Sequence, residues 1–308
     1  MHRGNVMLLA GLCAGAVVAM LIAAATLRSP DPVAASAPLL GTAPPVTTSV
    51  ATTASSAPPD TTVAKPSPKP DQDQDQEQGR LPSGAELAKL VPGKVSVLVH
   101  DRKSGEDVVS YRPETTYTSA SLVKLLIAFE ALRQGTEPDV VAEMLSRSDD
   151  NVASRLWANL GGPAIVSGWA ARIGMRSTRP PADPAHWGST IVTAADLVKL
   201  YEYLMDKAPE GTRQVVLRAL DAATQHGADG FDQFFGIPGA VTAADWAVKQ
   251  GWSCCDPGRN LHTSGLVGGR RYIVVVLSAQ SADTGWPTAS DRVTAVVKAL
   301  SGPLGWAK

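Results

Sequence analysis

Strand-like segments lie at both ends of residues 81–308, and helical segments fill the stretch between them. Near the start, Lys94–Arg102 is rich in valine, and a polar turn leads back into Val108–Arg112, which predicts an antiparallel hairpin. Near the end, three more strand-like segments follow, and they are Asp245–Trp252, Asn260–Val267 and Arg270–Gln280. We therefore predict an α+β fold, in which helices flank an antiparallel five-stranded sheet and an all-helical lobe is inserted between its strands.

The helical segments have apolar residues every three or four positions. Ser83–Val91 begins with a capping pattern and predicts a short first helix, and Ala289–Gly302 predicts an amphipathic last helix. The loop Met175–Thr190 interrupts the inserted helices. These helices are predicted at Ser121–Gln134, Asp139–Ser148, Asn151–Leu160, Ala164–Gly174 and Ala194–Met205. A ligand cleft is expected where the helical lobe meets the sheet.

The first 80 residues do not read as part of this domain. Val6–Leu27 carries no charge and is long enough to span a bilayer, and the preceding basic residues favour a cytoplasmic N-terminus. We expect residues 1–27 to be a single-pass membrane anchor, with the remaining chain on the extracytoplasmic side. The alternative is a cleaved signal sequence and a secreted protein, because Ala35–Ala37 resembles a cleavage site. A lipidated cysteine is expected to follow a small residue, whereas Cys13 follows Leu12. The pattern therefore does not favour a lipoprotein.

Composition and charge narrow the range of functions. Residues 28–80 are rich in Pro, Ala, Thr and Ser and predict a disordered linker, which leaves 81–308 as the folded domain. The chain has 28 Lys and Arg residues against 29 Asp and Glu residues, so nothing indicates a nucleic-acid partner. Histidines and cysteines lack metal-ligand spacing, and no metal or cofactor is predicted. Cys254 and Cys255 are adjacent, and both a pair of thiols and a redox role stay open.

Two polar residues interrupt the apolar segment that starts the helical part. Ser121 and Lys124 are three positions apart and lie on one face of the predicted helix, whose first turn favours negative charge. Burial among the neighbouring leucines would lower the pKa of Lys124 and make its neutral amine a proton acceptor for the serine. The alternative is a core helix with a lysine that extends to solvent.

Two further motifs follow in order: Ser148-Asp149-Asp150 at the start of a helix, and Lys249-Gln250-Gly251 on a strand. With Ser121 and Lys124, they resemble the three signatures of class A β-lactamases and penicillin-binding D-alanyl-D-alanine peptidases. The resemblance covers residues 81–308. It implies an enzyme that forms an acyl-enzyme with β-lactams or peptidoglycan stem peptides.

Four catalytic roles follow from the resemblance. Ser121 would be the acylated nucleophile, and Lys124 would accept its proton. Ser148 would relay a proton to the leaving nitrogen, while Lys249 would hold that serine and the substrate carboxylate.

Four more residues are predicted to bind the substrate. The backbone N–H groups of Ser121 and Trp252 would form an oxyanion hole, and Arg259 would bind a carboxylate unless it is an ordinary turn residue. Asp150 stands where the family has asparagine, and an ionised carboxylate cannot donate the hydrogen bond that the amide gives to the substrate. Gln250 replaces threonine, and its longer amide could partly take over the lost hydroxyl contact.

Two departures leave alternatives open. The alignment Asp149-Asp150-Asn151 restores the asparagine but puts an aspartate where the relaying serine belongs, and a one-residue shift turns a helix by about 100°. In class A β-lactamases, a loop glutamate activates the deacylating water. The loop Arg176–Thr190 has no glutamate, and Asp183 has a shorter reach, so slow deacylation is expected. The alternative function is a catalytically attenuated cell-envelope binding or scaffold protein with this fold.

Overall fold

The computed structural model describes residues 79–255 and 258–307. The predicted membrane anchor, and the predicted linker up to residue 78, lie outside these residues. Within the described ranges, no helix has the length and apolar character that crossing a bilayer requires.

Five antiparallel strands form the central sheet, in the order β2-β1-β7-β6-β5. The predicted hairpin supplies two of them, and the C-terminal meander supplies the other three. The strands are β1 (Lys94–Asp101), β2 (Glu106–Tyr111), β5 (Trp246–Ser253), β6 (Arg259–Val267) and β7 (Tyr272–Gln280). Pairing of β1 with β7 joins the two ends of the domain, and β5 is an edge strand. The predicted α+β fold with a five-stranded antiparallel sheet is confirmed.

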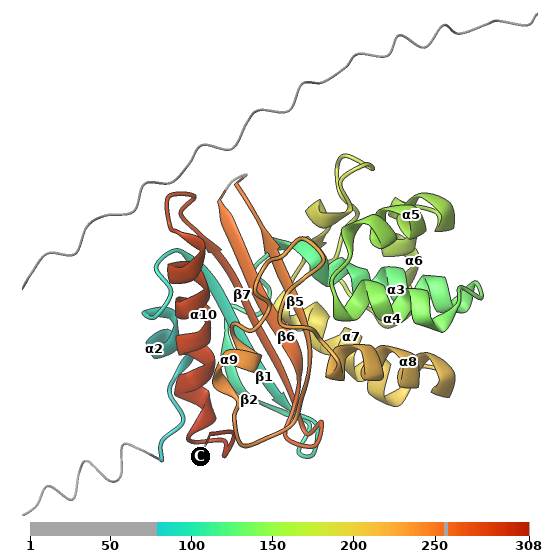
Figure 1. Cartoon of the computed structure of the whole chain (residues 1–308). Helices are drawn as coiled ribbons and strands as arrows, with labels where there is room; N and C mark the ends of the chain where they lie inside the picture. Colours follow the sequence, from blue (N-terminus) through green and yellow to red (C-terminus); the bar gives the residue numbers. More distant parts are fainter. Residues whose placement is uncertain (1–78, 256–257, 308) are drawn as a thin grey trace, which may run out of the picture. The chain divides into compact units, whose positions relative to one another are not determined.

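Helices cover both faces of the sheet (Figure 1). Along β7, Val274 and Val276 pack into one core with Val293 of helix α10 (Trp286–Ser301). Val275 and Leu277 belong to the other core, which the helical lobe fills. Because alternate residues of a strand point to opposite faces, the valine-rich β7 is buried on both sides. The short helices α2 (Gly84–Ala88) and α9 (Ile237–Ala240) lie on the α10 side.

The helical lobe is built around α3 (Lys124–Arg133), in which every residue from Lys124 to Ala131 is buried. This position explains why the segment is apolar on all sides. The sequence patterns predicted the surrounding helices except α8, which packs against α4. These helices are α4 (Pro138–Ser146), α5 (Asp150–Leu160), α6 (Pro163–Ile173), α7 (Ala194–Asp206) and α8 (Glu210–Asp221). Shorter elements are β3 (Tyr117–Thr118), η1 (Ala120–Val123), η2 (Trp187–Ser189) and β4 (Ile191–Val192).

Candidate active site

Ser121 lies in the 3₁₀ turn η1 that leads into α3, and not in the first turn of the α-helix as predicted. The preceding Ala120 has a φ of 46°, a left-handed conformation that residues with a Cβ atom seldom adopt. Strand β5 packs against this turn. Glycine favours this close approach, because a Cβ atom on Gly251 would lie 3.0 Å from the carbonyl oxygen of Ser119, a tight contact. The serine is therefore held beside the edge strand of the sheet.

Lys124 is the first residue of α3, and its side chain is fully buried. Its amine donates hydrogen bonds to the hydroxyl of Ser121 at 2.8 Å and to the hydroxyl of Ser148 at 3.1 Å. It also contacts the carbonyl oxygen of Ser148 at 2.7 Å and a carboxylate oxygen of Asp150 at 2.5 Å. One amine thus joins the two serines and one carboxylate.

Lys249 completes the cluster from strand β5. Its buried amine donates to the hydroxyl of Ser148 at 2.9 Å and to the carbonyl oxygen of Gln250 at 3.0 Å. Ser148 has a φ of 53°, and such conformations cost energy that the surrounding structure must supply. The structure brings together Ser121, Lys124, Ser148 and Lys249, the four residues that were predicted to be catalytic.

Burial dominates the electrostatics of the two amines. Burial lowers the pKa of Lys124, while the adjacent carboxylate of Asp150 opposes this shift. The pKa of Lys249 lies well below its ordinary value. Burial is the larger cause of this shift, and the positive charge of Lys124 is the second. Within the described part of the chain, Lys249 forms no ion pair. Of the two amines, Lys249 is therefore the one that loses its proton more readily.

The Lys249→Met chain is expected to be more stable than the wild type near neutral pH, by on the order of 1 kcal/mol, because it removes a desolvated amine. In the wild type, the unfolded chain binds a proton up to the ordinary lysine pKa, whereas the folded chain, in which the pKa of Lys249 is lowered, releases it at lower pH. Wild-type stability therefore rises with pH toward that value, and the advantage of the variant shrinks. Thermal unfolding across pH measures both effects. The exposed Lys207→Met is the control, and a variant no more stable than the wild type would contradict the expectation.

The two alignments of the second motif place different residues at the lysines. Asp149 caps helix α5, because its carboxylate accepts the backbone N–H groups of Asn151 at 2.8 Å and Val152 at 3.0 Å. Asn151 itself is exposed. The hydroxyl between the two amines is that of Ser148, so the geometry follows the Ser148-Asp149-Asp150 alignment. Asp150, in contact with Lys124, occupies the asparagine position.

The predicted substrate-binding residues lie in different surroundings. Trp252 stays beside the cluster, with its ring centroid 5.8 Å from the amine of Lys249 and its Nε1 donating to Asp229. The amide of Gln250 does not face the cluster, because it is buried and donates to the carbonyl oxygens of residues 233 and 235. It is thus not placed to replace a threonine hydroxyl. Arg259 stacks on Trp286, 4.0 Å from the ring centroid, and has no contact with the four clustered residues.

Trp187 is the neighbour of the cluster whose place the sequence did not reveal. Its ring centroid lies 4.8 Å from the amine of Lys124, and its Nε1 donates to Ser154 at 3.1 Å. In the same loop, the exposed carboxylate of Asp183 contacts His186 and the backbone N–H of Ala185. The loop therefore presents an indole ring to Lys124, while its carboxylate contacts groups of the loop itself.

A cavity of about 390 Å³ lies between this loop and the end of β5. Thr118, residues 185–189, Ser253 and Cys254 line it. Cys254 is joined to Cys255 by a disulfide, so they are not the two free thiols that the sequence also allowed. Among the described residues, no group of histidines, cysteines and carboxylates could hold a metal ion.

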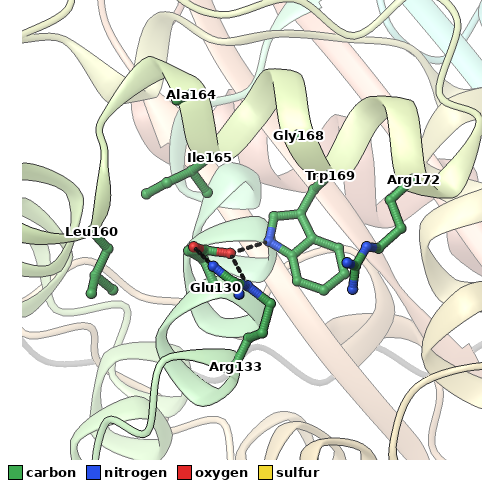
Figure 2. Close-up of a pocket in the computed structure, with 8 residues that line it drawn as sticks. All are labelled: Glu130, Arg133, Leu160, Ala164, Ile165, Gly168, Trp169 and Arg172. Atoms are coloured by element: carbon green, nitrogen blue, oxygen red, sulfur yellow. Dashed lines mark hydrogen bonds and ion pairs between the residues drawn. The ribbon is translucent and has the colours of Figure 1, made fainter.

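A second polar pocket, of about 270 Å³, lies between α3 and α6 (Figure 2). Its buried carboxylate, Glu130, accepts hydrogen bonds from Arg133, Gln134 and the Nε1 of Trp169. These bonds, with Arg133 contributing most, lower the pKa of Glu130 to about 2. Because its polar groups satisfy one another, this cluster fastens two helices together and is separate from the serine–lysine site.

Comparisons with known proteins connect these observations. Residues 84–139 match the family model described as the β-lactamase enzyme family. Proteins of Mycobacterium tuberculosis and Mycobacterium bovis, both named "Putative lipoprotein LppW", are 37% identical to the chain over 235 residues. The match covers 72% of this chain and 74% of each relative.

Solved structures show the same fold at lower sequence identity. The class A β-lactamase from Mycobacterium abscessus is 20% identical with a TM-score of 0.60, and the match covers 72% of this chain and 98% of that one. A β-lactamase from Chitinophaga pinensis is 14% identical with a TM-score of 0.60, over 74% of this chain and 98% of the other. At these identities, the likeness establishes the fold alone.

Proposed function

Because the chain belongs to the family of the mycobacterial LppW proteins, within the serine β-lactamase-like superfamily, we propose that its folded domain is a serine acyl-transferase or hydrolase. It would form an acyl-enzyme at Ser121 with β-lactams or peptidoglycan stem peptides. The observation that carries this proposal is the buried cluster, in which Lys124 contacts both serine hydroxyls and Lys249 contacts that of Ser148.

Acylation would use each of these contacts. The Ser121 oxygen attacks the carbonyl carbon of the substrate, and its proton passes to the amine of Lys124. The carbon–nitrogen bond then breaks, and the leaving nitrogen takes a proton through the Ser148 hydroxyl. Lys249 holds that hydroxyl in place. The products are a serine ester and a free N–H group, so one proton leaves the serine and one arrives on the nitrogen.

Release of the acyl group is proposed to be slow. Hydrolysis of the ester needs a water molecule activated by a base. The loop next to the cluster offers the indole ring of Trp187, while Asp183 is engaged by His186 and a backbone N–H group. An aromatic ring neither accepts a proton nor orders a water as a carboxylate does. The acyl-enzyme should therefore persist.

The cell envelope is the proposed location, on the extracytoplasmic side. Support comes from the mycobacterial relatives, which carry the name of a lipoprotein. The single-pass anchor at residues 1–27 stays a prediction from the sequence.

Incubation with benzylpenicillin is expected to add one penicillin mass to the chain, since ring opening keeps both halves of the molecule on the ester. Intact-mass spectrometry measures the adduct, and peptide mapping should place it on Ser121. The adduct should survive for hours after free penicillin is removed. No adduct after hours of incubation would contradict the proposal, and release within seconds would contradict slow deacylation alone.

A catalytically attenuated binding or scaffold protein is the second candidate. The ion pair of Lys124 with Asp150 favours it, because a carboxylate stabilises the protonated amine, which cannot accept a proton. Reversible binding of penicillin without an adduct would identify this alternative.

A further inference from the structure

Asp150 has one carboxylate oxygen free beside the reacting serine. One of its oxygens contacts the amine of Lys124, which also contacts the hydroxyl of Ser121. The side chain is 64% exposed, and within the described residues Lys124 is its sole hydrogen-bond partner. A substrate whose carbonyl carbon meets Ser121 would therefore bring its next substituent within reach of this carboxylate.

The chemistry of that oxygen restricts the substituent. An ionised carboxylate only accepts hydrogen bonds, so it repels a carbonyl oxygen and attracts an N–H, O–H or ammonium group. The surrounding charges act in the same direction. The carboxylates of Asp149 and Asp229 also raise the pKa of Lys124, so both lie within electrostatic reach of the same amine. Three carboxylates thus act on two lysine amines, which leaves this side of the site with an excess of negative charge.

The aromatic border favours a cation as well. The rings of Trp187 and Trp252 already lie 4.8 Å and 5.8 Å from the amines of Lys124 and Lys249. Indole faces attract ammonium groups through the ring quadrupole. A positively charged substituent would thus meet a carboxylate and aromatic faces, whereas an amide carbonyl would meet neither a donor nor a cation that is free to bind it.

We propose that the site selects acyl substrates that carry a free ammonium group, or another strong hydrogen-bond donor, next to the reacting carbonyl, and that Asp150 is the residue that makes this selection. The inference rests on the proposed function, and it ranks the substrates of the site. Stem peptides and benzylpenicillin, whose nitrogen at this position is acylated, would be bound more weakly than substrates with a free amine there. Acylation of this nitrogen removes its positive charge and adds a carbonyl oxygen, which the carboxylate repels, so substrates with an acylated nitrogen at this position are disfavoured.

Two dipeptides separate the alternatives. D-alanyl-D-alanine has an α-amino group, which is mostly protonated at pH 7, whereas N-acetyl-D-alanyl-D-alanine has an amide there. Their dissociation constants are measured by NMR titration on the full chain carrying Ser121→Ala, so that binding is seen without acylation. The free dipeptide is expected to bind more tightly. The ratio of the two constants should shift by roughly fivefold or more toward the acetylated ligand when Asp150→Asn is added.

The control and the salt dependence exclude indirect effects. Asp183→Asn, a change of an exposed carboxylate in the neighbouring loop, should leave the ratio unchanged. The preference should also weaken as salt is raised, because it is electrostatic. An equal ratio with and without Asp150→Asn, or no binding of either dipeptide, would overturn the inference. If Asp150→Asn shifts the ratio but the protein with Ser121 intact never forms an acyl adduct, the inferred selectivity stands and the proposed function is contradicted.

Discussion

A Ser121→Ala chain is expected to form no penicillin adduct, a loss on the order of 10⁴-fold or more in acylation rate. The reason is chemical, since the substituted chain retains both lysines and Ser148 but lacks the oxygen that attacks the carbonyl carbon. Intact-mass spectrometry over the same incubation that labels the wild type measures the effect. Circular dichroism should show an unchanged fold, because the hydroxyl is a small group whose described hydrogen bond is to Lys124 alone.

Ser253→Ala supplies the matched control. Ser253 lies at the end of β5 and lines the neighbouring cavity, but its hydroxyl contacts Asn260 and no lysine. The Ser253→Ala chain should be acylated at nearly the wild-type rate. In the wild type, no amine is placed to take a proton from Ser253, so this serine is not expected to be the nucleophile. If the adduct still forms in Ser121→Ala but not in Ser253→Ala, the nucleophile is Ser253, which would contradict the assignment to Ser121.

The order of the strands and motifs made the centre of the site predictable. Strands at both ends of the domain imply a sheet closed by the C-terminal meander, and the three motifs lie where helices and β5 can meet. The local form of the chain at the serine was less predictable. The motif predicted an α-helical turn, whereas close packing of Gly251 against residue 119 accompanies a tighter 3₁₀ turn.

The orientation of Gln250 could have been foreseen. Successive residues of a strand point to opposite faces, so Lys249 and Gln250 could not both turn toward Ser148. The structure shows this alternation, since the lysine reaches the serine and the amide binds backbone carbonyls on the other side. The contact of Arg259 with Trp286 depended on the register of β6, which composition does not determine.

Two other features lacked a usable sequence signal. Helix α8 has its buried valines and leucines close together, as in Val215, Val216 and Leu217, and a strand could show the same short apolar run. Trp187 reaches Lys124 through the path of a long loop, which long-range packing decides. Backbone hydrogen bonds to the buried carboxylate of Asp196 hold the start of that loop.

Lys124→Met is expected to lower the acylation rate by roughly 10² to 10⁴-fold, the usual contribution of a positioned general base. Methionine has a similar length and suits a buried position, so the loss should not come from unfolding. In the wild type, the rate should rise with pH, because only the neutral amine accepts the serine proton. Burial lowers the pKa of Lys124, so the rise should end below the pH at which an ordinary lysine titrates.

The pH profile of the Lys124→Met chain distinguishes two routes for the serine proton. If Lys124 is the acceptor, the residual rate loses the rising limb that its titration causes. If the rate and the limb both persist, Lys124 is not the acceptor of the serine proton, and Lys249, whose amine contacts the hydroxyl of Ser148 at 2.9 Å, is the other buried amine of the cluster. Asp150→Asn gives an independent check on the first route. Removing the carboxylate lowers the pKa of Lys124 further, so the limb should move to lower pH in that chain.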